Sequence, residues 1–171
     1  MSPRRRVVSV IGGSREDDAK VLSLAFDLGR GIKRGGWHLA CGGMTGVMEA
    51  ACRGFQSTEG PGLAIGILLS GRREDGNAFL DLVLPTGLGL ARNALVVQAG
   101  DAVVAVGGES GTLSEIALAW QYGRPVIGIV PAGGFGAELA GRTLDRRRDD
   151  VVRRAASVES ALAILAEVLG P

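Results

Sequence analysis

Glycine pairs follow the short apolar runs of this sequence and constrain the fold more than any other feature. Such pairs stand at 12–13, 42–43, 107–108 and 133–134; the first three directly follow a strand-like run, and the last follows one by a few residues. The run Val7–Ile11 is rich in β-branched residues and bounded by glycine, which is typical of a parallel strand buried on both faces. Glycine loops after such strands indicate an open α/β sheet with a ligand site at the carboxyl ends of its strands.

Strand-like and helix-like segments alternate along the whole chain, which is typical of a parallel α/β fold. We expect a doubly wound, Rossmann-like parallel sheet of six or seven strands in three layers, forming a single nucleotide-binding domain over residues 1–171. The expected strands are 7–11, 37–41, 63–69, 80–84, 101–106 and 125–130, with a short edge strand starting at 151–152. The expected helices are one capped by Ser14 and ended by Gly35 and Gly36, then 46–56, 88–99, 111–122, and a last helix capped by Ser157.

Composition excludes several functional classes. The formal net charge is +1, and only two of the 19 basic residues are lysines, so a nucleic-acid partner is not expected. No apolar run reaches the roughly 20 residues that span a bilayer, and no signal-peptide pattern opens the chain, so we expect a cytoplasmic protein without a membrane partner. Cys41, Cys52 and His38 lack metal-ligand spacing, so no metal site is expected. The charged segment 142–150 is interpreted as a solvated loop.

Three glycine loops are suited to holding a small phosphorylated ligand. Glycines let the backbone approach a phosphate, hydroxyl side chains add donors, and the helix that follows contributes a positive N-terminus. Neither a dinucleotide fingerprint nor a Gly-Lys-Ser/Thr phosphate loop is present. The expected phosphate-binding residues are Gly12, Gly13 and Ser14 in the first loop, Gly42, Gly43 and Thr45 in the second, and Gly107, Gly108, Ser110, Gly111 and Thr112 in the third.

Nearly the whole chain resembles the LOG-like family of cytokinin riboside 5'-monophosphate phosphoribohydrolases, in a superfamily that also contains molybdenum-cofactor carrier proteins and many proteins mislabelled as lysine decarboxylases. The resemblance is carried by the residues 12–14, 41–49, 91–93 and 107–115. It implies that Arg92 and Glu115 are catalytic, and that the ligand is a nucleoside monophosphate or the molybdenum cofactor, with no further cofactor required. It also implies a homodimer or homotetramer, to which the apolar face with Leu113 and Trp120 could contribute.

Two positions differ from the family pattern. Asn93 stands where the family usually has lysine, and Glu109 stands at the second glycine of the pattern P-G-G-x-G-T-x-x-E. A carboxylate close to a bound phosphate would repel it. These two departures favour a carrier, whereas Arg92 and Glu115 favour an enzyme that releases free base and ribose 5-phosphate. Enzymatic activity is therefore left open, and a ligand-sensing module is a third interpretation.

Arg92 and Glu115 each have a structural interpretation beside the functional one. The spacing of Thr112 and Glu115 is that of a capping box at a helix start. Arg92 falls in the expected first helical turn, where a cation opposes the helix dipole, so an anion should lie nearby; a ligand phosphate and Glu115 are the candidates. Lys20 and Lys33 both lie along the first expected helix, so pyridoxal chemistry has no suitably placed lysine.

Overall fold

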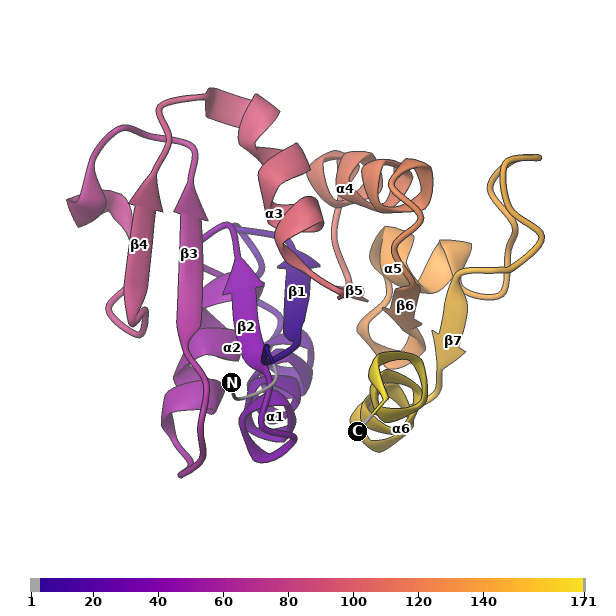
Figure 1. Ribbon diagram of the computed structural model, residues 1–171, viewed down its shortest axis with the longest axis horizontal. Helices are drawn as coiled ribbons and strands as arrows, with labels where there is room; N and C mark the ends of the chain where they lie inside the picture. The colour runs from indigo at the N-terminus through magenta and orange to yellow at the C-terminus, as the bar shows by residue number, and fades with distance from the viewer. Residues whose placement is uncertain (1–3, 171) are drawn as a thin grey trace.

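The computed structural model describes residues 4–170 and contains a single seven-stranded sheet in which all paired strands are parallel (Figure 1). The strand order is β4-β3-β2-β1-β5-β6-β7. The strands are β1 (Val7–Gly12), β2 (His38–Cys41), β3 (Ala64–Leu68), β4 (Leu82–Pro85), β5 (Ala102–Val106), β6 (Val126–Ile129) and β7 (Arg153–Ala155). This architecture confirms the expected doubly wound, Rossmann-like fold and gives seven as the strand count.

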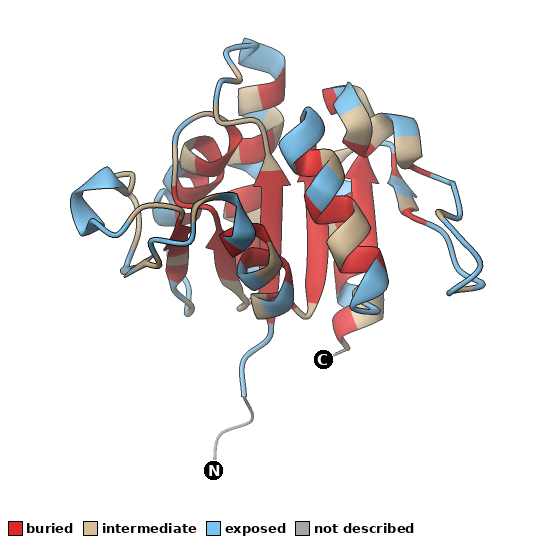
Figure 2. Ribbon diagram, turned by 90° about the horizontal axis from the view of Figure 1, so that it is seen from above, coloured by how far each residue is buried: buried red, intermediate tan, exposed pale blue. Residues whose placement is uncertain are grey.

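Helices cover both faces of the sheet because successive residues of the central strands are apolar on both sides (Figure 2). Val10 and Val104 belong to the core under one set of helices, and Val103 and Ala105 to the core under the other. The first set is α1 (Ala19–Arg34), α2 (Val47–Gln56) and α6 (Val158–Leu169), and the second is α3 (Asn93–Ala99), α4 (Ser110–Gln121) and α5 (Gly134–Leu139). Short 3₁₀ turns are η1 (Arg73–Asp75), η2 (Gly89–Arg92) and η3 (Val130–Ala132).

The order of the strands creates a crevice between β1 and β5. From β1 the chain builds β2, β3 and β4 outward on one side, and then returns to place β5 on the other side of β1. In register, Val10 of β1 lies opposite Val104 of β5, so the two strands end together at Gly12 and Val106. The loops that leave their carboxyl ends run in opposite directions, which is the position where open α/β sheets bind ligands.

Several element boundaries differ from the sequence-based expectations. Asp18, not Ser14, caps α1, because its carboxylate accepts the amide of Lys20 while the residues before it form a turn. The expected helix 88–99 is split into the 3₁₀ turn η2 and the helix α3, so Arg92 lies at their junction. The expected cap at Ser157 is confirmed, since Ser157 and Ser160 bond each other's backbone amides.

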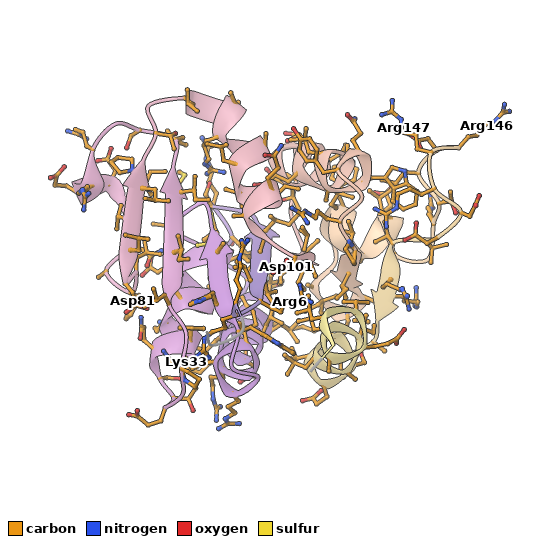
Figure 3. All side chains as sticks on the ribbon, in the orientation of Figure 1. Arg6, Lys33, Asp81, Asp101, Arg146 and Arg147 are labelled. Carbon is orange, nitrogen blue, oxygen red and sulfur yellow. The ribbon has the colours of Figure 1, made fainter. Side chains whose placement is uncertain are left out.

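The edge strand also starts later than expected. It covers Arg153–Ala155, because the backbone of Val152 instead bonds Gly141 and Arg142. The charged segment before it is an exposed loop, as expected, and Arg146 and Arg147 project away from the fold (Figure 3).

Trp120 belongs to the core that this charged loop helps to close. The indole is 2% exposed, its Nε1 donates to Asp145 at 2.9 Å, and the guanidinium of Arg148 lies 4.5 Å above the ring. Trp120 is therefore a core residue, and a contribution of the face around Leu113 to a subunit interface stays a prediction. Within residues 4–170, none of the helices combines the length and hydrophobicity that crossing a bilayer requires.

Candidate functional site

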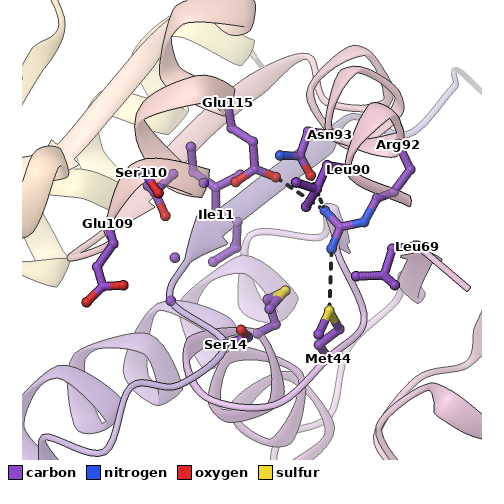
Figure 4. A pocket seen from close by; sticks show the side chains of 16 residues that line it. Ile11, Ser14, Met44, Leu69, Leu90, Arg92, Asn93, Glu109, Ser110 and Glu115 are labelled. Carbon is purple, nitrogen blue, oxygen red and sulfur yellow. Dashed lines mark hydrogen bonds and ion pairs between the residues drawn. The ribbon is translucent and has the colours of Figure 1, made fainter. Parts of the chain in front are cut away.

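A cavity of about 180 Å³ opens in the crevice between β1 and β5 (Figure 4). Its walls come from the end of β1, the loop and helix after β2, the end of β3, the η2–α3 junction and the first turns of α4. The lining residues are Val10, Ile11, Gly12, Gly13, Ser14, Met44, Met48, Leu69, Leu90, Arg92, Asn93, Glu109, Ser110, Gly111, Thr112 and Glu115.

The first wall is the loop after β1, and close packing explains its glycine. A Cβ on Gly12 would lie 2.5 Å from Cγ1 of Val47 and 2.7 Å from the carbonyl of Val106, so glycine lets β5 and α2 approach this turn. Two hydrogen bonds hold the turn from the β2 side: the amide of Val47 donates to Gly13 at 3.0 Å, and the hydroxyl of Thr45 donates to the carbonyl of Ser14 at 2.7 Å. The loop is thus a fixed surface of the cavity.

The second wall is the N-terminus of α4. Gly107 and Gly108 adopt positive φ angles of 63° and 94°, which turn the chain sharply from β5 into the helix. The first amides of a helix have no intrahelical acceptors and carry the positive end of the dipole. At Gly111, apart from its chain neighbours and the backbone of its own helix, no atom of the described residues lies within 4 Å of the position a Cβ would take. Ser110, Gly111 and Thr112 therefore present a helix N-terminus to the cavity, an arrangement suited to an anion.

The third wall carries a buried ion pair. Nη1 of Arg92 lies 3.5 Å from Oε1 of Glu115, and the two side chains are 6% and 9% exposed. The same Nη1 donates to Oδ1 of Asn93 at 2.7 Å, and Nη2 lies 3.6 Å from the sulfur of Met44 (Figure 4). Among the described residues, Nε of Arg92 is buried without a hydrogen-bond partner. Of the two anions expected beside Arg92, Glu115 is in place, and a ligand phosphate stays a prediction.

Burial sets the charge state of this pair. It raises the pKa of Glu115 to about 7, and the positive charge of Arg92 opposes that rise. It also lowers the pKa of the Arg92 guanidinium, although guanidinium remains charged at neutral pH. The alternative role of Glu115 in a capping box is wrong: α4 begins at Ser110 with Glu109 as its N-cap, so Thr112 lies inside the helix.

The expected site residues fall into two groups. The cavity brings together Arg92 and Glu115 with Gly12, Gly13 and Ser14 of one loop and Ser110, Gly111 and Thr112 of another. The expected residues that do not line it are Gly42, Gly43, Thr45, Gly107 and Gly108. A ligand-binding role for these five stays a prediction.

Sequence reasoning did not assign several cavity residues to the site. Met44 and Met48 come from the glycine loop and helix after β2, Leu69 follows β3, and Leu90 lies in η2. Met44 and Met48 lie in the segment 41–49 that carries the family resemblance, and Met44 also stands directly after a glycine pair. Asn93 and Glu109 were noted only as departures from a family pattern, and the structure places both in the lining. Across residues 4–170, no cluster of three His, Cys, Asp or Glu side chains is arranged to hold a metal ion.

Comparison with known proteins gives the same fold and a consistent family. The molybdenum cofactor binding protein of Rippkaea orientalis is 34% identical, with a TM-score of 0.86, over 99% of this chain and 100% of the other. The molybdenum cofactor carrier protein of Chlamydomonas reinhardtii is 32% identical, with a TM-score of 0.83, over 97% and 99% of the two chains. An uncharacterized protein of Archaeoglobus fulgidus is 38% identical over 72% of this chain and 80% of its own.

More distant structures share only the fold, as with DNA processing protein A of Helicobacter pylori at 17% identity and a TM-score of 0.64 over 95% and 80% of the two chains. The sequence model of the SLOG cluster4 family matches residues 5–162. The chain therefore belongs to the SLOG cluster4 family, within the wider LOG-like superfamily.

Proposed function

We propose that this chain binds the molybdenum cofactor, a phosphorylated pterin, in the β1–β5 cavity and carries it without breaking a covalent bond. The observation that carries this proposal is a buried guanidinium, Arg92, in the same cavity as the free N-terminus of α4. Both features attract anions, and together they suit a ligand whose phosphate lies at the helix. The similarity over nearly the whole chain to cofactor-binding and cofactor-carrier proteins supports the choice of cofactor.

Glu109 further supports a carrier over an enzyme acting on a tightly held monophosphate. It occupies the N-cap position of α4 without making a side-chain capping hydrogen bond, and it lines the cavity, so a bound phosphate would share the cavity with a carboxylate. Repulsion between these charges weakens binding. Weaker binding suits a carrier, which has to release its cargo.

A second candidate function rests on Glu115. A carboxyl group with a pKa of about 7 in a cavity is suited to proton transfer near neutral pH. With Arg92 orienting a ribose 5-phosphate, Glu115 would protonate the departing base or position a water while the N-glycosidic bond breaks. This candidate is the phosphoribohydrolase implied by the resemblance to the LOG-like family.

The carrier proposal is tested by binding, with two matched variants. Purified protein is mixed with molybdenum cofactor released from a molybdoenzyme, and bound cofactor is measured after gel filtration. Gly111→Asp places a carboxylate at the start of α4, where it favours the helix but repels a ligand phosphate. The control is Gly71→Asp, which adds the same charge outside the cavity. Apart from its chain neighbours, no atom of the described residues lies within 4 Å of the Cβ that this substitution adds.

Wild type and Gly71→Asp are expected to retain the cofactor, and Gly111→Asp is expected to lose at least about tenfold in affinity, from repulsion of about 1.4 kcal/mol or more. Equal retention by all three proteins would contradict the proposed cavity, and no retention by wild type would contradict the carrier.

The hydrolase candidate is tested in parallel with a panel of nucleoside 5'-monophosphates. Free base is measured by chromatography after incubation with wild type, Glu115→Gln and Arg92→Ala. Base released by wild type alone would establish the enzyme. Nucleotide recovered intact despite measurable binding would eliminate it and leave the carrier.

A further inference from the structure

The guanidinium of Arg92 has fewer good acceptors than its burial demands. It offers five N–H groups in a side chain that is 6% exposed. One strong hydrogen bond goes to Asn93 at 2.7 Å, one weak contact goes to the thioether of Met44 at 3.6 Å, and Nε has no partner among the residues described. The charged contact, to Glu115, is 3.5 Å long. A buried cation with this set of contacts is strongly stabilised by a better anion.

The groups around Glu115 determine what happens to its proton. Arg92 faces it from η2, the thiol of Cys41 interacts with both from the end of β2, and Glu109 lines the same cavity from the N-cap of α4. Arg92 is the only cation among these neighbours. An anion bound to Arg92 would therefore face the Glu115 carboxylate in a poorly solvated space, where two like charges repel strongly.

We propose that Arg92 exchanges Glu115 for a tetrahedral oxoanion of the ligand, and that Glu115 takes up a proton as the oxoanion binds. This inference rests on the proposed function, because it assumes that the ligand enters this cavity. One dianion and one proton from solvent enter together, and both leave together. The protonated carboxyl group of Glu115 then donates a hydrogen bond to an oxygen of the anion, so the site selects a fully deprotonated oxoanion.

Burial makes this exchange accessible near neutral pH. The pKa of Glu115 is already about 7 without a ligand, so its proton is gained or lost at little cost in that range. Above that pH a proton has to be taken from solvent, and affinity for the oxoanion falls. Cargo would therefore be held more tightly as pH decreases towards neutrality and released as pH increases.

The test measures the affinity for molybdate and for sulfate by calorimetry at pH values from about 6 to about 9. Both oxoanions remain dianionic over this range, so the probe itself adds no pH dependence to the measured affinity. Molybdate represents a metal oxoanion and sulfate a phosphate-like group, and their relative affinities distinguish these two sources of the bound group. The proteins are wild type, Glu115→Gln, Arg92→Gln and the control Gly71→Asp.

For wild type we expect affinity to fall about tenfold per pH unit above pH 7, as uptake of one proton requires. Glu115→Gln is expected to bind without this slope and Arg92→Gln to lose the site, whereas Gly71→Asp is expected to keep both the affinity and the slope because Gly71 does not line the cavity. Calorimetry of wild type in two buffers of different ionisation enthalpy should give close to one proton taken up per anion at pH 8, which needs no variant.

A flat pH profile for wild type, an unchanged slope in Glu115→Gln, or no detectable oxoanion binding would each overturn the inference. None of these outcomes affects retention of the cofactor on gel filtration. Conversely, a proton-linked oxoanion site in a protein that does not retain the cofactor would leave the exchange standing and remove the carrier function.

Discussion

The loop between β2 and α2 and the loop between β5 and α4 contain glycines in similar places, but the space around those glycines differs. At Gly111, in the first turn of α4 after the β5 loop, the position of a missing Cβ faces open space, whereas at Gly108 of the loop itself a Cβ would overlap the side chain of Thr112. At Gly42 of the β2 loop, a Cβ would lie 2.4 Å from Nη2 of Arg92, and at Gly43 it would lie 2.5 Å from Cδ2 of Leu68. Glycine thus leaves open space at the start of α4 and makes room for the protein's own side chains in the β2 loop.

Arg92 connects these two loops, which is why their difference matters for the site. Its Nη2 passes over Gly42 and reaches Met44 in the β2 loop, and its Nη1 pairs with Glu115 in the helix that follows the β5 loop. The glycines after β2 therefore position the guanidinium, and the helix after β5 supplies its charged partner. The β2 loop thus contributes to the cavity by close packing around Arg92, and the helix after the β5 loop contributes the carboxylate of Glu115.

The largest expected effect is a difference in stability between alanine substitutions at a packed glycine, Gly43, and at a glycine that faces open space, Gly111. Gly43→Ala should destabilise the fold by about 4 kcal/mol, because the residue has a φ of 70° and the new Cβ would overlap Leu68. Gly111→Ala should leave the stability unchanged or raise it by up to about 1 kcal/mol, because alanine favours a helix and meets no atom there. Urea denaturation measures both free energies of unfolding.

Equal losses in the two alanine variants would show that the start of α4 is as tightly packed as the β2 loop, and would remove the distinction. A Gly43→Ala variant with unchanged stability would also remove the distinction, because it would show that the β2 loop is not tightly packed.

The next effect concerns the pair that joins the loops and appears as a pH dependence of stability. The carboxyl group of Glu115 has a pKa of about 7 when folded and near 4.5 otherwise, so the folded state binds more protons between these values. The Glu115 contribution to the free energy of unfolding should therefore decrease as pH rises from about 4.5 to 7, by roughly 3 kcal/mol, and stay level above pH 7.

Glu115→Gln is the control for this pH dependence, since it keeps the shape and removes the titration. The difference in unfolding free energy between wild type and Glu115→Gln, measured by urea denaturation at several pH values, isolates the contribution of this carboxyl group. A constant difference across the range would mean that Glu115 is not held as a buried acid beside Arg92.

The fold was predictable because strand patterns and connections are local properties of the sequence. Runs such as 102–106 are apolar throughout, and only a strand covered on both faces needs that composition. Element ends were less predictable where several capping groups compete. Ser14 and Asp18 are both residue types that cap helices. The path of the chain between them selects Asp18, and no local sequence pattern predicts that path.

The site was predictable in part, for a related reason. Arg92, Glu115 and the start of α4 could be assigned from the residues and a family resemblance, and all of them line the cavity. The sequence could not tell which glycines face the cavity, since Gly42 contacts Arg92, which is 50 residues away in the chain. Met48 and Leu69 were missed because apolar lining residues have the same composition as the core.

The smallest expected effect tests whether the β2 loop also supports the cavity at a distance. The hydroxyl of exposed Thr45 donates to the carbonyl of Ser14 at 2.7 Å, which ties the β2 loop to the β1 wall. Thr45→Val should lower the stability by no more than about 1 kcal/mol, because water can replace an exposed hydrogen bond, yet it should weaken cofactor binding about threefold by releasing Ser14.

Thr143→Val is the matched control, since its exposed hydroxyl donates to the carbonyl of Asp150 at 3.0 Å in a loop that does not line the cavity. Gel filtration of each variant with cofactor measures the binding. If Thr45→Val and Thr143→Val bind alike, the β2 loop acts on the site only through Arg92 and the side chains of Met44 and Met48, and the tie to Ser14 contributes to local folding alone.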